Sequence, residues 1–361
     1  MLAQIGQSLP HVRIAPPGPR SREIAARLAA VESPSVDARR EARAGASGET
    51  FAPIVYASAR GSNVIDADGN VYVDMAAGFG ALLLGHGAAP VATALEAQSE
   101  RLWLALGDVF ASQAKLDLCE RLAKLYPEPE ARVMLGASGA DAVTAALKTA
   151  VLATGRAGIL AFEGSYHGLT HGPLAACGLH PGFREPFALQ LNPSVVFVPY
   201  PRSADSLDGI MTAVDQALRA RGAGAIGAVL VEPILGRGGC VVPPSGFLPL
   251  LRAACDRSGA LLVSDEIWTG LGRSGAWIAS IDAGVLPDLI CLGKGLGGGL
   301  PVSACVGSAR AMAGWAAHGG ATIHTATHFG APLGCATALA TLDAIESGDL
   351  ATRARDVGAR W

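Results

Sequence analysis

The feature that most constrains the fold is a repeated alternation, between residues 89 and 361, of short apolar runs with longer segments of helical pattern. The apolar runs lie at 132–135, 159–162, 195–198, 228–231, 261–263 and 289–292, and the helical patterns at 90–106, 113–125, 140–153, 206–221 and 246–258. Continuous apolar strands separated by helices are typical of a parallel sheet that is covered on both faces. We therefore predict an α/β fold with a mostly parallel sheet, whose chemistry gathers beyond the carboxyl ends of its strands.

The beginning of the chain has a different pattern. Residues 1–50 contain a proline cluster and a charged segment, and we expect an arm with one helix at 21–31. A hairpin follows, in which the apolar residues 64–65 would pair with 71–73. The turn between them contains Asp68-Gly69, which supplies the permissive backbone that a hairpin turn needs.

Charge and cysteine usage narrow the class of protein. The chain has 28 Lys and Arg against 31 Asp and Glu, a net charge of −3, so no basic field favours nucleic acid. No apolar run approaches the roughly 18 residues of a membrane helix, and no secretory signal is visible. The seven cysteines are scattered, without ligand spacing, and indicate buried thiols in a reducing compartment. We expect a cytoplasmic enzyme with no metal site and no nucleic-acid or membrane partner.

The strongest candidate for chemistry is Lys294, which follows an apolar run and lies among glycines. Burial would lower the pKa of its amine and make it nucleophilic, as Schiff-base chemistry requires, whereas the alternative is a solvated lysine in a glycine loop. Gly293, Gly295 and Gly298 also match the dinucleotide-binding pattern GxGxxG, but no acidic residue stands about 20 positions further on. A nucleotide site is therefore disfavoured.

A second candidate is Asp265, which follows the apolar run 261–263 and Ser264. A carboxylate at the end of a buried strand is costly unless a cation or a protonated ring pairs with it. Beneath a pyridine nitrogen it would keep that nitrogen protonated and make the ring an electron sink. The alternative is a capping or salt-bridging aspartate.

Two further turns follow predicted strands. The turn at 136–141 precedes a helix, and its amides together with Ser138 would bind a phosphate, although the same residues also form an ordinary N-cap. The turn at 162–168 contains Tyr166 and His167. An aromatic ring there would stack on a planar cofactor, and the alternative is a structural pair in a glycine turn.

Taken in order, these segments resemble a class-III aminotransferase, a pyridoxal-phosphate (PLP) enzyme of fold type I. The resemblance extends over roughly residues 53–346, and the ordered set of motifs is specific although each motif alone is weak. The matching segments are Ser138-Gly139-Ala140-Asp141-Ala142-Val143, Ala145-Ala146-Leu147-Lys148, Tyr166-His167-Gly168, Glu232-Pro233-Ile234, Gly236-Arg237-Gly238-Gly239, Asp265-Glu266-Ile267-Trp268-Thr269-Gly270, Pro287-Asp288, Gly293-Lys294-Gly295 and His324-Thr325-Ala326-Thr327.

The resemblance implies catalytic and cofactor-binding roles. Lys294 would form the Schiff base with PLP and then move the proton of the amino-group transfer, while Asp265 would pair with the ring nitrogen. Ile267 would pack on the ring face opposite Tyr166. The remaining cofactor-binding residues implied are His167 and, around the phosphate, Ser138, Gly139, Ala140 and Thr327.

The resemblance also implies partners and a substrate wall. A threonine matching Thr327 reaches the phosphate from the partner subunit, which implies an obligate homodimer. Glu232 resembles a glutamate near the substrate, and Phe79 and Gly80 resemble wall residues on the substrate side, with an ordinary glycine turn as the alternative.

The sequence departs from the family pattern beside Thr327, where His328-Phe329 and Ala331 are atypical, and at Ala140-Asp141. Family members also continue into a full C-terminal domain, so we expect this chain to be a fragment. The expected segments are an arm at 1–50, a small-domain hairpin at 51–88, a large PLP-binding domain at 89–330 and the start of a truncated domain at 331–361.

The implied function is PLP-dependent transfer of an amino group from an amino acid to a 2-oxo acid. The neighbourhood of Arg237 resembles the branch that acts on ω-amino acids such as 4-aminobutyrate. Two alternatives stay open at this point. One is an amino-acid racemase or aminomutase of the same fold, and the other is a truncated, catalytically silent PLP-binding module.

Overall fold

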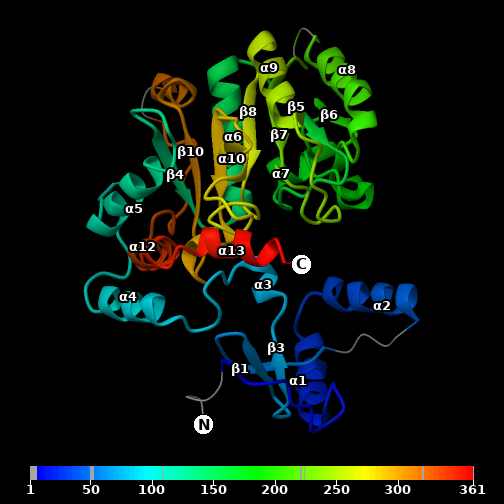
Figure 1. Ribbon diagram of the computed structural model, residues 1–361, viewed down its shortest axis with the longest axis vertical. Coiled ribbons are helices and arrows are strands. Elements are labelled where there is room, and N and C mark those ends of the chain that lie inside the picture. The colour runs from blue at the N-terminus through cyan, green and yellow to red at the C-terminus, as the bar shows by residue number, and fades with distance from the viewer. Residues whose placement is uncertain are drawn as a thin grey trace. The chain divides into compact units, whose positions relative to one another are not determined.

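The computed structural model describes residues 6–48, 53–107, 109–219, 222, 224–318 and 321–360. Its contacts divide the chain into two compact units, Met1–Ala89 and Pro90–Trp361. Figure 1 labels most elements of both units. The four segments expected from the sequence stay a prediction, because a contact division does not establish which segments act as domains.

The described residues of the first unit form a small antiparallel sheet and the helices α1 (Pro19–Ala29), α2 (Ser35–Ser47) and the short α3 (Ala77–Gly80). The strands are β1 (Tyr56–Arg60), β2 (Asn63–Asp66) and β3 (Val71–Val73). Strands β2 and β3 form the predicted hairpin, with Val64 opposite Tyr72 and Ile65 opposite Val71. The sequence pattern missed β1 and α2. Helix α2 has no buried residue, so it lacks the apolar stripe from which a helix is predicted.

The second unit is built on a seven-stranded sheet of order β4-β10-β9-β8-β7-β5-β6. The strands are β4 (Arg132–Gly136), β5 (Gly158–Phe162), β6 (Val195–Val198), β7 (Ile226–Val231), β8 (Leu261–Asp265), β9 (Leu289–Leu292) and β10 (Ser303–Gly307). The predicted α/β class with a mostly parallel sheet is confirmed. Strand β10 was not predicted. It runs antiparallel between β4 and β9, and it is short and poor in β-branched residues.

Helices connect and cover these strands. They are α4 (Ala89–Ser99), α5 (Gln113–Ala123), α6 (Gly139–Thr154), α7 (His171–Ala175), α8 (Leu207–Leu218), α9 (Phe247–Ser258), α10 (Ala279–Asp282), α11 (Ala309–Met312), α12 (Pro332–Ser347) and α13 (Leu350–Gly358). Short 3-10 turns lie among them at η2 (Pro181–Phe183), η3 (Glu185–Gln190), η4 (Ala204–Ser206), η5 (Lys294–Gly297) and η6 (Ala313–His318). The helix predicted at 90–106 is shorter in the structure, where α4 ends at Ser99.

Two apolar clusters, one on each face of this sheet, form the core. Alternate residues of one strand enter different clusters: Leu160 and Phe162 pack with helices α8 and α9, whereas Ile159 and Ala161 pack with α6 and α11. Because both faces are covered, the strands read as continuous apolar runs in the sequence. The same packing holds the carboxyl ends of the strands in a fixed relation to the start of α6.

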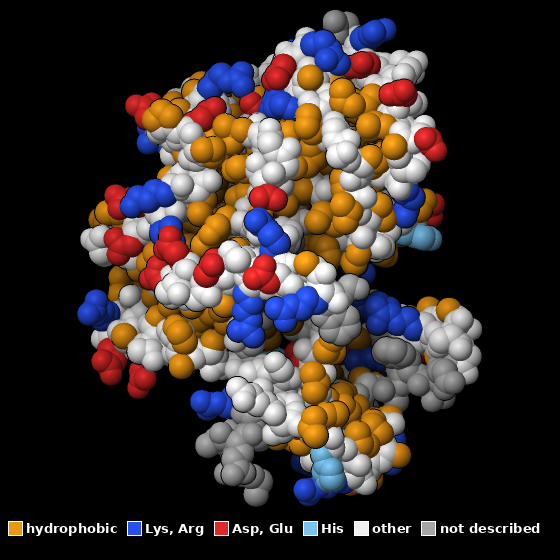
Figure 2. All heavy atoms as spheres, viewed as in Figure 1, with side chains coloured by type: hydrophobic (Ala, Val, Ile, Leu, Met, Phe, Trp, Pro, Cys, Tyr) orange, Lys and Arg blue, Asp and Glu red, His pale blue; other side chains and the backbone are white. Residues whose placement is uncertain are grey.

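Figure 2 shows acidic and basic side chains interspersed over the visible surface of the second unit. None of the described helices is long and apolar enough to cross a membrane. All seven cysteines are free thiols, and five of them are buried. The prediction of buried thiols is wrong for Cys240, which is exposed because it lies in the loop after β7 and not in the sheet core.

Candidate active site

The predicted chemical residues follow strands that are neighbours in the sheet. Strands β9, β8, β7 and β5 lie side by side and run parallel, so their carboxyl ends meet at one edge. Asp265 ends β8, Glu232 follows β7, His167 lies in the turn after β5, and Lys294 follows β9 after one glycine. The structure therefore brings together at one edge the side chains that the sequence spreads over more than a hundred residues.

A buried ionisable pair occupies the middle of this edge. His167 Nδ1 lies 2.7 Å from Asp265 Oδ2, and the two residues are 2% and 4% exposed. The backbone N–H of Ile267 donates to the other carboxylate oxygen, Asp265 Oδ1, over 3.1 Å. Both oxygens of Asp265 thus accept hydrogen bonds, which fixes the plane of the carboxylate. His167 Nε2 is buried and has no hydrogen-bond partner among the residues that the structure describes.

Lys294 begins the 3-10 turn η5 directly beyond β9 and is half-buried. Its φ of 35° lies in the left-handed region, where a residue with a side chain is strained. Burial lowers the pKa of the Lys294 amine. The positive charges of Arg273 and Arg237 also lower this pKa, whereas the negative charges of Asp265 and Glu232 raise it. A larger fraction of this amine is neutral than of an ordinary lysine, as a nucleophilic amine requires.

Glu232 connects the turn after β5 with the loop after β7. Its Oε1 accepts a hydrogen bond from the backbone N–H of Tyr166 over 2.8 Å, and its Oε2 accepts one from Gly236 over 3.0 Å. The residue is 5% exposed, and burial raises the pKa of its carboxyl. The carboxyl group therefore holds two backbone segments in place at the edge of the site.

Helix α6 begins at the same edge with a complete capping box. The Ser138 hydroxyl accepts from the backbone N–H of Asp141 over 3.3 Å, and the Asp141 carboxylate accepts from the N–H of Ser138 over 2.8 Å. The amides of Gly139 and Ala140 precede the first intrahelical bonds and belong to the orphan donors of a helix start. Both interpretations of this segment thus apply: an N-cap is present, and two amides are left for an anion.

Small residues make this edge narrow. A Cβ atom added to Gly139 would lie 2.7 Å from Ile267 Cδ1, and one added to Gly293 would lie 3.5 Å from the Cα atom of Gly139. A Cβ on Gly168 would lie 2.9 Å from the Cβ of Ala140. Gly139 at the start of α6, Ile267 two residues after Asp265, and Gly293 directly before Lys294 are therefore closely packed, and larger residues would not fit without a shift.

Comparison with known proteins identifies the family. The model of the family described as "Aminotransferase class-III" matches residues 44–361. An acetylornithine aminotransferase of Methanopyrus kandleri is 38% identical over 293 residues, which are 81% of this chain and 70% of the relative. A 5-aminovalerate aminotransferase of Pseudomonas aeruginosa is 35% identical over 313 residues, covering 85% of this chain and 72% of the relative. The chain is a class-III aminotransferase.

Solved structures agree with this assignment. The class-III aminotransferase superposes with a TM-score of 0.80 on an amine transaminase from an uncultivated Pseudomonas species in its PLP-bound form. The two are 32% identical, and the match covers 86% of this chain and 74% of the other. An (S)-enantioselective ω-transaminase from Thermomicrobium roseum gives a TM-score of 0.82 at 29% identity, with 94% and 78% covered. The aminotransferase is thus an enzyme that transfers amino groups with pyridoxal phosphate as its cofactor.

The residues of the aminotransferase fit that cofactor. A flat ring needs backbone segments without bulky side chains beside it, and Gly139 and Gly293 next to Ile267 provide them. A phosphate needs donors, which the amides at the start of α6 supply. A ring nitrogen needs a buried carboxylate, and Asp265 is fixed and buried. The donor set of the site therefore matches the groups that PLP presents.

One residue at this edge received no role from the sequence. The guanidinium carbon of Arg237 lies 4.2 Å from the centroid of the Tyr166 ring. Arg237 was noticed only as part of a glycine-rich motif. The sequence pattern brings the loops after these two parallel strands to one edge, but it does not show that the two side chains are in contact.

Three predicted site residues are not brought to this edge by the described contacts. Thr327 is exposed, in the segment before α12, and Phe79 and Gly80 belong to the first unit. Phe79 is 88% exposed and has a left-handed φ of 56°. The roles of these three residues stay predictions.

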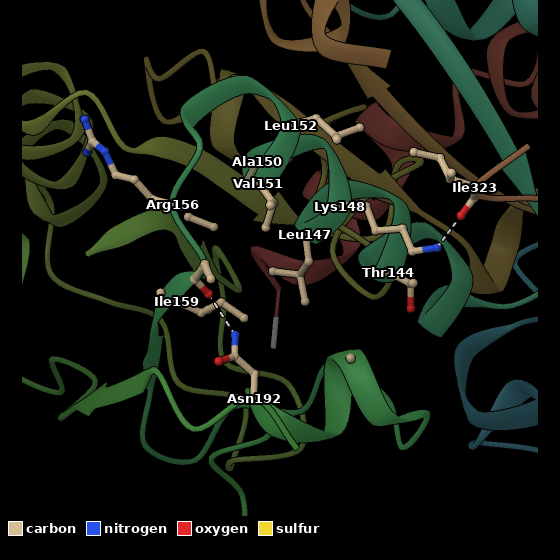
Figure 3. Close-up of a pocket in the computed structure, with 14 residues that line it drawn as sticks. Thr144, Leu147, Lys148, Ala150, Val151, Leu152, Arg156, Ile159, Asn192 and Ile323 are labelled. Atoms are coloured by element: carbon tan, nitrogen blue, oxygen red, sulfur yellow. Dashed lines mark hydrogen bonds between the residues drawn. The ribbon is translucent and has the colours of Figure 1, made fainter. Parts of the chain in front are cut away.

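A hollow of about 490 Å³ lies beside α6, and its lining includes none of the site residues predicted from the sequence. Figure 3 shows Leu147, Val151 and Ile323 among the side chains around it. The Lys148 ammonium donates to the backbone oxygen of Ile323 over 2.6 Å, which ties α6 to the segment that leads to Thr327. The hollow is therefore an apolar surface feature of the large unit and not the cofactor site.

Proposed function

We propose that this aminotransferase moves an amino group from an ω-amino acid, such as 5-aminovalerate or 4-aminobutyrate, to a 2-oxo acid in the cytoplasm. The observation that carries the proposal is the half-buried Lys294 amine beyond β9, on the sheet edge that also holds buried Asp265. The preference for an ω-amino acid is supported by the similarity to a 5-aminovalerate aminotransferase. The alternatives of a racemase or aminomutase and of a silent module have no observation in their favour.

Each residue has a stated task in this proposal. Bound PLP supplies a carbonyl that accepts the amino group and a ring that takes up an electron pair. The amides of Gly139 and Ala140 would hold the phosphate. The Ser138 hydroxyl, which donates to Asp141 Oδ2 over 2.9 Å, would join them once it turns away from that carboxylate. Tyr166 and Ile267 would enclose the ring, and Asp265 would accept a hydrogen bond from the ring nitrogen and keep it protonated.

Lys294 has two tasks. Its neutral amine would hold the cofactor through the carbonyl carbon, and the same amine, when free of the cofactor, would accept the proton from the substrate carbon that bears the nitrogen. The lowered pKa of the Lys294 amine favours both tasks, because only the neutral amine attacks a carbonyl or accepts a proton. His167 acts through Asp265, whose orientation it holds.

We also propose that two copies of the chain form the working enzyme, with Thr327 of each reaching the phosphate of the other. The apolar hollow beside α6 supports this proposal, since Ile323 lines it and is 39% exposed. Ile323→Glu should shift the sedimentation coefficient toward the monomer and weaken cofactor binding. Leu250→Glu, at another exposed apolar position that is 44% exposed, is the control and should leave the dimer intact.

The test of the main proposal begins with the cofactor. Protein loaded with PLP should show a visible absorption band that borohydride bleaches, and mass spectrometry should then find the cofactor on the peptide that contains Lys294. Lys294→Ala should lose this attachment, whereas Lys124→Ala, which removes an exposed lysine at the end of α5, should keep it. Attachment in Lys294→Ala at the wild-type level would contradict the assignment.

The second part of the test is the reaction. Wild-type enzyme with 5-aminovalerate and a 2-oxo acid should form the amino acid of that oxo acid in equal amount to the donor consumed. Racemisation or isomerisation of the donor without net consumption of the oxo acid would instead support the racemase or aminomutase alternative.

A further inference from the structure

The loop after β7 presents one arginine to the aromatic residue of the site. Arg237 is exposed, and its guanidinium carbon lies 4.2 Å from the centroid of the Tyr166 ring. No salt bridge to Arg237 is found within the described ranges of the chain. A guanidinium that rests on an aromatic face still presents its N–H groups to a planar anion, because these donors lie in its own plane.

The backbone around Arg237 is fixed, so the side chain starts from a defined point. Leu235 and Val241 exchange two backbone hydrogen bonds of 2.9 and 3.0 Å, which close the loop. The N–H of Gly236 donates to the buried Glu232 carboxylate. A Cβ atom on Gly238 would lie 2.5 Å from the carbonyl oxygen of Gly164, so this loop is pressed against the turn that leads to Tyr166.

The neighbouring charges do not neutralise Arg237. Both oxygens of Glu232 accept from backbone amides, of Tyr166 and Gly236. Arg202 donates to the carbonyl oxygen of Gly238 over 3.4 Å and is thus engaged with the loop backbone. The positive charge of Arg237 reaches Lys294, where it helps to lower the pKa of the amine. Arg237 therefore has no side-chain ion pair among the described residues, and its positive charge is available to an anion.

We propose that Arg237 binds the carboxylate of the amino-acid and oxo-acid substrates and thereby determines that the enzyme prefers acids over simple amines. This inference rests on the proposed function, since it names the group that recognises the substrates of the same site. The planar guanidinium binds a carboxylate through two parallel hydrogen bonds, and the Tyr166 ring limits the directions in which it points. Arg237 is thus a specificity residue and takes no part in proton transfer.

The test compares two amino donors that differ only in the carboxylate. The rate at which 5-aminovalerate and pentylamine convert the PLP form of the enzyme is followed through the cofactor absorbance, without any oxo acid present. For Arg237→Leu we expect kcat/KM to fall roughly 30- to 100-fold with 5-aminovalerate and less than about 3-fold with pentylamine. Arg237→Lys should retain part of the preference, because it keeps the charge but not the planar pair of donors.

A matched control removes an arginine elsewhere. Arg257→Leu takes away a single exposed ion pair with Asp215 and should leave the ratio of the two rates unchanged. A second readout is the binding of glutarate, a dicarboxylate without an amino group, by calorimetry. Its affinity should fall about 10-fold in Arg237→Leu and should not change in Arg257→Leu.

The outcomes separate this inference from the proposed function. If wild-type enzyme reacts with both donors and Arg237→Leu lowers both rates equally, or keeps its affinity for glutarate, the role of Arg237 is overturned while amino transfer stands. If wild-type enzyme loaded with PLP reacts with neither donor, the proposed ω-amino-acid function itself fails.

Discussion

His167 and Asp265 are joined by a 2.7 Å contact between two side chains that are both almost fully buried, one from the turn after β5 and the other from the end of β8. Strand β7 lies between these two strands, so the contact spans the sheet edge. An ionised carboxylate only accepts, so the ring nitrogen that faces Asp265 carries the proton. The pair thus orients the carboxylate that we assign to the cofactor ring nitrogen.

Replacing His167 should therefore affect both stability and the site. His167→Leu leaves a buried carboxylate oxygen without its donor, and we expect a loss of about 2–4 kcal/mol in the free energy of unfolding of the cofactor-free protein. Urea denaturation followed by circular dichroism measures this loss. His167→Asn offers an amide N–H near the position of Nδ1 and should recover part of both the stability and the cofactor affinity. Equal behaviour of the Leu and Asn variants would show that His167 acts by packing alone.

The pH dependence of cofactor uptake should report the environment of Lys294. Burial lowers the pKa of its amine below the ordinary 10.5, so the neutral form appears at a lower pH than in a free lysine. The uptake rate should rise with pH and level off above this lowered pKa, because the protonated amine does not attack a carbonyl. Stopped-flow absorbance measures the rate, and Nα-acetyl-lysine with the same PLP solutions is the reference.

Neighbouring charges shift the pKa of Lys294 in opposite directions, which predicts how the midpoint of the uptake rate moves in two variants. The positive charge of Arg237 lowers the Lys294 pKa, and the negative charge of Asp265 raises it. The midpoint of the rate should therefore move to higher pH in Arg237→Leu and to lower pH in Asp265→Asn. A wild-type midpoint equal to that of Nα-acetyl-lysine would contradict the burial of the amine.

Much of the site could be predicted from the sequence because each polar residue directly follows an apolar run. In a parallel sheet the carboxyl ends of the strands meet at one edge, so Asp265 and Lys294 could be grouped from their positions in the chain. Strand β10 could not be recognised in this way. Its pairing with both β4 and β9 is antiparallel and non-local, and its sequence is short and rich in small residues.

The sequence also could not show which way neighbouring carboxylates point. Glu266 follows Asp265 directly, yet its Oε1 accepts from the backbone N–H of Ser280 over 2.7 Å, at the start of α10. Side chains of successive strand residues point to opposite faces, but the two residues lie where the strand ends, so this rule does not decide between them. The contacts of Arg237 with Tyr166 and of His167 with Asp265 likewise join residues 71 and 98 positions apart.

A second stability prediction concerns Asp288, at the beginning of β9 and thus at the opposite end of the strand from Lys294. This 5% exposed carboxylate accepts from Arg252 over 2.7 Å, from Arg310 over 2.6 Å and from the backbone N–H of Leu262 over 2.8 Å. Asp288→Ala should lower the free energy of unfolding by about 3 kcal/mol, because it leaves the half-buried Arg252 guanidinium with only the exposed Asp256 and leaves the buried Leu262 amide without its acceptor.

The control for Asp288 uses the same arginine. Asp256 pairs with Arg252 over 2.8 Å, but its side chain is 64% exposed, so Asp256→Ala should cost less than about 1 kcal/mol. Urea unfolding measures both variants. Neither should change the absorption spectrum of the bound cofactor, and a shifted spectrum in Asp288→Ala would mean that the two ends of β9 are coupled.

The last prediction tests the close contact between the start of α6 and Ile267. Gly139→Ala adds a Cβ atom 2.7 Å from Ile267 Cδ1, and the helix backbone leaves Ile267 as the group that must move. Because Ile267 would enclose the cofactor ring, we expect the affinity for PLP to fall about 10-fold while the free energy of unfolding changes by less than about 1 kcal/mol. Equilibrium dialysis measures the affinity.

Two further variants make this result specific to the contact. Gly209 lies inside helix α8 with no atom near the added Cβ position, so Gly209→Ala should leave PLP affinity unchanged and stabilise the protein by about 0.5–1 kcal/mol. In Gly139→Ala the additional change Ile267→Val removes the Cδ1 atom that the new methyl group meets, and it should recover most of the affinity. Failure of Ile267→Val to recover it would place the effect of Gly139 on its backbone amide, which we assign to the phosphate, instead of on the ring.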